Sequence, residues 1–266
     1  MPSHLSSIGF RVENAKELAR LAEELSLKAE TIAVKTGKYL RWAGPGGEQL
    51  WLQINARREL VGINPHFEGL TRLRIGVVSR ISRTGDTALD GGFHAWASPS
   101  GVPDDGEYPF VFDAPDAATY SDLEIPSVAE AQVTAFAHEL ALFDSEEAYN
   151  SAQSSDGVQF ASRSFVPSGM FSPGDQKEGP PTAEAIFTGQ ILQAESRTNA
   201  VSGLPFWWAV VDTLGGQFDV VADPSIVEKQ PVVGGFLSGS FWLSGRLVTY
   251  SRKPKGWFGR LLGGTG

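Results

Sequence analysis

The sequence of 266 residues contains no cysteine. This absence excludes disulfide bonds, thiolate metal ligands, iron–sulfur clusters and cysteine nucleophiles. The chain also begins without a basic segment followed by an apolar stretch and a small-residue cleavage site. No apolar run approaches the roughly 18 residues that a membrane-spanning helix needs. We therefore expect a cytoplasmic protein with no transmembrane segment.

Motifs that bind phosphates or activate a serine are missing as well. No glycine-rich segment between a predicted strand and a predicted helix has the spacing of a dinucleotide or nucleotide triphosphate loop, and no serine lies in a G-x-S-x-G pattern. We expect no organic cofactor and no serine-hydrolase chemistry.

Positive charge is scarce in most of the chain. The net charge is −9, and residues 183–250 carry three Lys or Arg against six Asp or Glu, a balance of −3. Because nucleic-acid affinity depends on cations that neutralise phosphates, a nucleic-acid partner is not expected. The exception is the basic and aromatic tail, residues 251–266, which carries four cations and suits contact with an acidic surface.

Residues 1–149 are predicted to form an α+β domain in which a mostly antiparallel sheet is covered by two helices. Asn14 and Glu17 have the spacing of a helix N-cap. Ser127 and Glu130 form a capping box that starts a second predicted helix, which carries the apolar stripe Ala129, Val133, Phe136, Ala137, Leu140 and Phe143. Alternating or short apolar runs predict strands over residues 4–12, 31–55 (two or three strands), 70–82, 91–97 and 107–115, and residues 64–69 read as a turn.

The second half of the chain has a different composition. Residues 150–182 are rich in Ser, Gly and Pro, which indicates a linker or surface loop. Residues 183–250 are strand-like almost throughout, with a long strand that contains Gly189, a hairpin around a Gly-Gly turn and a glycine-rich later strand. This order resembles the OB-fold, so the resemblance implies a small OB-like β-barrel over residues 183–250 and a fold class that is α+β but mostly β.

The N-terminal stretch "HLSSIGFRVENAKELARLAEE" and the strands up to Gln53 resemble the βαβββ unit of the vicinal-oxygen-chelate superfamily. Members of that superfamily bind a metal through ligands from several strands. The resemblance implies that a divalent metal is compatible with this chain, with His4, His66 and His94 as the candidate ligands. The chain as a whole resembles bacterial proteins of unknown function.

His138 and Glu139 form half of the zinc metalloprotease pattern H-E-x-x-H. Leu142 occupies the position of the second histidine, so we do not expect a protease site there.

Three hypotheses for function follow. The first is a non-enzymatic binding or assembly protein whose ligand or partner surface lies at the seam between the domains, with the tryptophans Trp42, Trp51, Trp96, Trp207 and Trp242 as candidate contacts. A protein partner or a homo-oligomer is compatible with it, because strand 205–213 is apolar on both faces. The alternative is a metal-dependent enzyme that uses His4, His66 and His94. The third is single-stranded nucleic-acid binding through the barrel.

Overall fold

The computed structural model describes residues 3–153, 160–168 and 181–253. The described chain consists mainly of strands, with two α-helices and three short 3-10 helices. The prediction of a mostly β protein is confirmed. Neither helix is long and apolar enough to cross a membrane, as far as the described residues go.

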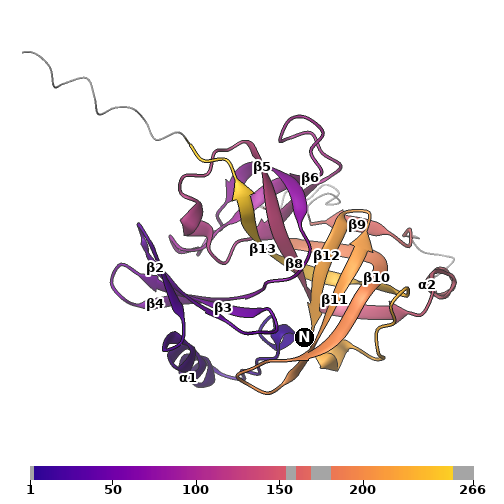
Figure 1. The fold of residues 1–266 in the computed structure, drawn as a ribbon, viewed down its shortest axis with the longest axis horizontal. Helices are drawn as coiled ribbons and strands as arrows, with labels where there is room; N and C mark the ends of the chain where they lie inside the picture. The colour runs from indigo at the N-terminus through magenta and orange to yellow at the C-terminus, as the bar shows by residue number, and fades with distance from the viewer. Residues whose placement is uncertain (1–2, 154–159, 169–180, 254–266) are drawn as a thin grey trace, which may run out of the picture.

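A four-stranded antiparallel sheet of order β1-β2-β3-β4 forms the N-terminal part of the fold, at the lower left in Figure 1. Its strands are β1 (Glu30–Val34), β2 (Gly37–Ala43), β3 (Glu48–Asn55) and β4 (Leu60–Phe67). Helix α1 (Ala15–Ser26) precedes it and buries Ala22 and Leu25. The Asn14 side chain caps the helix by accepting from the Glu17 backbone N–H, as its sequence predicts.

Two local predictions in this region were wrong. Residues 4–12 contain a 3-10 helix, η1 (Ser6–Ile8), in place of a strand, because Gly9 adopts a left-handed φ of 79° and its N–H bonds back to the Ser6 carbonyl. Residues 64–67, predicted as a turn, end strand β4. Pro65 is tolerated there because β4 is an edge strand of its sheet.

The second sheet has nine strands in the order β11-β12-β8-β5-β6-β7-β13-β10-β9. The additional pairings β11–β10 and β8–β13 close it into two rings of five strands. One ring contains β5, β6, β7, β13 and β8, and the other contains β10, β11, β12, β8 and β13, so that β8 and β13 belong to both. The strands are β5 (Leu73–Ile81), β6 (Gly92–Ala97), β7 (Pro109–Asp113), β8 (Ser127–Phe143), β9 (Ser164–Pro167), β10 (Glu184–Thr198), β11 (Pro205–Thr213), β12 (Gly216–Ala222) and β13 (Phe236–Tyr250).

The prediction of a second helix over residues 127–143 was wrong, because this segment is the 17-residue strand β8. The apolar residues of this segment fit the two-residue period of a strand as well as the spacing of one face of a helix. Small apolar residues at every second position, from Ala129 to Ala137, face the core, and Gln132, Thr134 and Phe136 face the other way. Pairing with β13 along almost the whole strand outweighs the helix propensity of its alanines. A sheet covered by two helices is therefore not the architecture.

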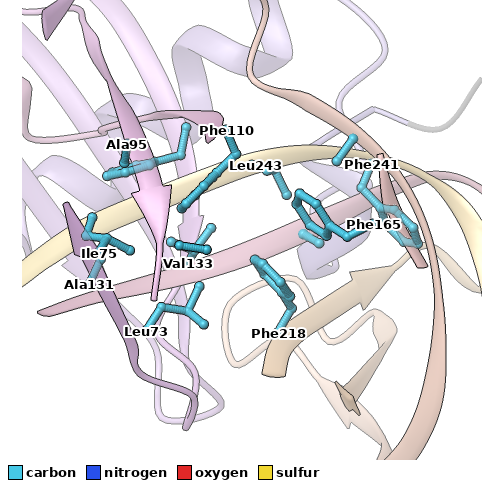
Figure 2. Close-up of a cluster of buried hydrophobic side chains, with 14 of the residues drawn as sticks. Leu73, Ile75, Ala95, Phe110, Ala131, Val133, Phe165, Phe218, Phe241 and Leu243 are labelled. Atoms are coloured by element: carbon cyan, nitrogen blue, oxygen red, sulfur yellow. The ribbon is translucent and has the colours of Figure 1, made fainter. Parts of the chain in front are cut away.

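The main core follows the two shared strands through both rings (Figure 2). Phe165, Phe187, Phe218 and Phe241 stack within it, and the Phe187 and Phe241 ring centroids lie 3.9 Å apart. A second core packs Phe206, Trp208 and Val210 of β11 against η1, α1 and the four-stranded sheet. Ala209 and Val211, on the other face of β11, belong to the main core, so both apolar faces of this strand are packed.

The predicted boundary over residues 150–182 does not separate two sheets, because β8 on one side of it pairs with β12 and β13 on the other. Helix α2 (Glu146–Ala152) and β9 lie at this boundary, and η2 (Ala117–Tyr120) and η3 (Pro224–Ile226) fall elsewhere between strands. Most of the basic tail, residues 254–266, lies outside the described residues.

Candidate functional site

A polar cavity of about 210 Å³ opens where the four-stranded sheet meets the two-ring sheet, and we call it the acidic cavity. Asn64 of β4 lines one side, and Trp242 and Ser244 of β13 line another. The remaining wall comes from the β5–β6 connection and the end of β7, with Arg83, Asp86, Asp90, Gly91, Asp113, Ala114 and Pro115. The pairing of Asp113 with Ser244, where the first ring closes, brings these segments together.

Three carboxylates are held in place around this cavity. Asp113 accepts from Arg83 Nη1 at 2.6 Å and from Trp242 Nε1 at 2.8 Å. Asp86 accepts from the Arg83 backbone N–H at 2.6 Å. Asp90 accepts from Gln53 Nε2 at 2.7 Å and from the Thr87 backbone N–H at 2.9 Å. Each carboxylate oxygen has two lone pairs, so acceptor capacity remains for a ligand.

The charge of the acidic cavity is negative overall. Three aspartates face one arginine, a formal balance of −2. Arg83 already donates from Nη1 to Asp113 and from Nη2 to the Pro181 carbonyl, and its buried Nε has no hydrogen-bond partner in the described structure. A charged group that enters this cavity favourably is therefore a cation.

Ser244 contributes a fixed hydroxyl to the same wall. His66 Nδ1 lies 2.9 Å from Ser244 Oγ, and both residues are fully buried. With its amide oriented to satisfy the Phe67 carbonyl, Gln132 donates to His66 Nε2. His66 then carries its proton on Nδ1 and donates it to Ser244. In that tautomer the imidazole is not a base toward the serine, and the Ser244 hydroxyl proton is free to bond to a ligand.

Trp242 connects the acidic cavity to a pair of histidines. The His4 ring stacks on the indole with centroids 4.2 Å apart and planes 8° apart. His4 Nε2 lies 2.8 Å from His138 Nε2, so one nitrogen donates and the other accepts. Burial, and after it the charge of His138, lower the pKa of His4 from 6.5 to about 4.

Stability should therefore depend on pH through His4. Between about pH 6.5 and pH 4 the unfolded chain binds this proton and the folded protein does not, so acidification lowers the free energy of unfolding, by up to about 3 kcal/mol for this group. Burial also lowers the pKa of His66, which adds to the same trend. Urea unfolding at about pH 7 and about pH 4 should show a smaller difference in a His4→Phe variant than in the native protein.

His94→Phe is the matched control for that measurement. His94 is only half-buried on β6, where burial lowers its pKa, so its replacement should change the pH dependence less. An unchanged pH dependence in His4→Phe would contradict the role of the histidine pair.

Of the five predicted tryptophans, only Trp242 lines the acidic cavity. Trp42 is buried against Phe10 in the second core. Trp51 is fully buried beneath the Arg246 guanidinium, 4.7 Å from its ring centroid. Trp96 and Trp207 are half-buried on β6 and β11. Most of these five indole rings therefore serve as packing groups.

The structure does not bring the predicted metal ligands together. His4 pairs with His138, His66 is enclosed with Ser244 and Gln132, and His94 lies on β6. Within the described ranges, no group of three or more His, Asp or Glu side chains is arranged to hold a metal ion.

Comparison with known proteins gave no relative. No family model, curated protein or solved structure matches this chain. The site is therefore interpreted from its own residues.

Sequence reasoning missed most of the acidic cavity. Asp113 belongs to a run of acidic residues between Asp104 and Glu124 that resembles a solvated loop. Asp86 and Asp90 lie in the glycine-flanked connection "RTGDTALDGG", which carries no recognised spacing. The one available signal was the concentration of aspartates at the ends of predicted strands, where loops gather at one edge of a sheet.

Proposed function

We propose that the protein is a binding protein whose acidic cavity takes an ammonium or guanidinium group. The supporting observation is the convergence of three carboxylates, one engaged arginine and the Trp242 indole around a cavity between the two sheets. Its place agrees with the general tendency of ligands to bind where structural units meet. Residues from both halves of the chain line the cavity, which supports a site at the seam between them.

The shape and chemistry of the acidic cavity favour a small cationic group. A volume of about 210 Å³ suits one functional group with a short chain attached. Carboxylates attract the charge, and an indole adds a favourable interaction of about 0.5–2 kcal/mol when a cation lies over the face of its ring. The free hydroxyl of Ser244 and the amide of Asn64 supply further polar contacts.

We propose binding without chemical conversion, in the cytoplasm. The His66 tautomer supports this, because it leaves Ser244 as a hydrogen-bond donor and not as an activated nucleophile. The absence of cysteine is compatible with a reducing compartment.

We also propose that the ring of β10, β11, β12, β8 and β13 is an OB-like barrel. A long first strand, a hairpin, the short η3 and a long closing strand support the likeness. Its aromatic residues do not favour stacking of nucleic-acid bases, because Phe206, Trp208, Phe218, Phe236 and Phe241 are buried.

Isothermal titration with agmatine, which carries a guanidinium and an ammonium group, tests the proposed function. Asp86→Asn should weaken agmatine binding by about tenfold, which corresponds to about 1.4 kcal/mol, because it removes one charge and keeps an oxygen to accept from Arg83 N–H. A capped Ala-Arg-Ala peptide, titrated in parallel, distinguishes a protein side chain from a small molecule as the source of the cation.

The exposed Asp104 supplies the matched control, because Asp104→Asn makes the same charge change outside the cavity. Its agmatine affinity should equal that of the native protein. Equal weakening by both variants, or no binding of either cation, would refute the proposed function.

A further inference from the structure

A second cavity adjoins the acidic cavity along the same boundary between the sheets, and we call it the basic cavity. Its volume is about 300 Å³. Lys35 and Thr36, in the β1–β2 turn, line one side, and Arg80 at the end of β5 lines another. Asp90 and Gly91 line both cavities, so the two share a wall.

The basic cavity has the opposite charge to its neighbour. Lys35 and Arg80 face one carboxylate, Asp90, a formal balance of +1. Asp90 accepts hydrogen bonds from Gln53 Nε2 and the Thr87 backbone N–H, and neither residue lines this cavity. Among the described residues, neither Lys35 nor Arg80 has a carboxylate within ion-pair distance.

Arg80 is held in position without being neutralised. Its Nη2 donates to the Tyr120 carbonyl, and its guanidinium lies 5.4 Å from the centroid of the Phe93 ring. The hydroxyls of Ser82 and Ser121 also line the cavity. A fixed guanidinium, an unpaired ammonium and hydroxyl donors together make a site that favours an oxyanion.

Gly91 lies at the junction of the two cavities and lines both. This residue has a φ of 149°, in the region that favours glycine, and an added Cβ would lie 3.3 Å from Ala117 Cβ and from the Ile81 carbonyl oxygen. Glycine therefore leaves space at the junction that a side chain would occupy.

We infer that the ligand is bipolar, with its cationic group in the acidic cavity and a carboxylate or phosphate group in the basic cavity. This inference rests on the proposed function and specifies the class of ligand. A bipolar ligand brings a group of opposite charge to each cavity, whereas a simple amine leaves Lys35 and Arg80 without a counter-ion.

Two matched pairs of probes test the inference by isothermal titration. L-Arginine differs from agmatine by a carboxylate, and O-phosphoethanolamine differs from ethanolamine by a phosphate. In at least one pair, the probe that carries the carboxylate or phosphate should bind the native protein about tenfold more tightly than its partner. The pair with the larger gain in affinity shows which of the two oxyanions the basic cavity prefers. Lys35→Gln should reduce that gain to about twofold or less and leave agmatine binding unchanged.

Lys35 is exposed in a turn, so its replacement should not disturb folding, and Lys28→Gln, at an exposed position outside both cavities, is the matched control. If agmatine binds and neither anionic probe binds more tightly, the bipolar inference is wrong and the proposed function stands. A gain that persists in Lys35→Gln also refutes the inference. If none of the four probes binds, the proposed function fails.

Discussion

Replacing Asp219 by alanine should lower the free energy of unfolding by about 4 kcal/mol. The Asp219 carboxylate is fully buried on β12 and accepts four hydrogen bonds. Two come from the Leu70 and Thr71 backbone N–H groups, at 3.0 and 2.9 Å, and two from Thr71 Oγ1 and Trp208 Nε1, at 2.6 and 2.8 Å. Alanine would leave these four donors without their acceptor, and three of them belong to the buried residues Thr71 and Trp208.

Asp219 lies where its loss should destabilise the whole fold, and not one segment alone. Residues 68–72 connect β4 of the four-stranded sheet to β5 of the two-ring sheet, and Asp219 fixes that connection. An added Cβ on Gly69 would lie 1.9 Å from the Asp219 carboxyl carbon, so the backbone approaches this side chain closely. The carboxylate thus fixes the position of the four-stranded sheet relative to the two-ring sheet.

Urea denaturation measures the effect. Asp219→Asn, which keeps one acceptor oxygen, should lose about half as much stability as the alanine variant. Asp212→Ala, on the same hairpin, breaks only a half-exposed ion pair with Arg163 and should cost less than about 1 kcal/mol. Similar losses for Asp219→Ala and Asp212→Ala would contradict the structural role of Asp219.

Replacing Arg246 by methionine should lower the free energy of unfolding by about 3–4 kcal/mol. Asp116 is 2% exposed and accepts from Arg246 Nε at 2.8 Å and from the Tyr120 hydroxyl at 2.9 Å. Burial raises the pKa of Asp116, and attraction by Arg246 opposes that shift. Without the arginine, a buried carboxylate remains with one donor and no counter-charge.

A double-mutant cycle separates this effect from lost packing on Trp51. Asp116→Asn in the Arg246→Met background should recover part of the stability, because a neutral amide needs no counter-ion. The penalty of Arg246→Met should also be smaller in acid, where Asp116 is protonated in the folded state. A penalty that is independent of pH and of residue 116 would assign the effect to packing alone.

The sequence predicted local structure correctly where a cap or turn signal stood next to an apolar pattern of a single period. Asn14 and Glu17 locate the start of α1, and the Gly-Gly turn locates the β11–β12 hairpin, because both signals act within a few residues. Strand β8 was misassigned because alanine-rich alternation satisfies the helical period and the strand period together. Only pairing with β13, about 100 residues later, decides between them.

The candidate site was harder to predict for the same reason. Trp242 and His4 were singled out from the sequence, and they do contact each other. Asp86, Asp90 and Asp113 come together only because the β5–β6 connection and the end of β7 meet β13 where the first ring closes. Such a contact depends on long-range strand pairing, which no local pattern encodes.

A cation that binds in the acidic cavity would lie beside Trp242. The indole N–H resonance of Trp242, assigned with a Trp242→Phe variant, reports on this site directly, because its Nε1 donates to Asp113. Titration with agmatine should shift this resonance to saturation and leave those of Trp96 and Trp207, which lie outside the cavity lining, unchanged. A Trp242 resonance that does not move, or equal shifts in all three indoles, would rule out cation binding in the acidic cavity.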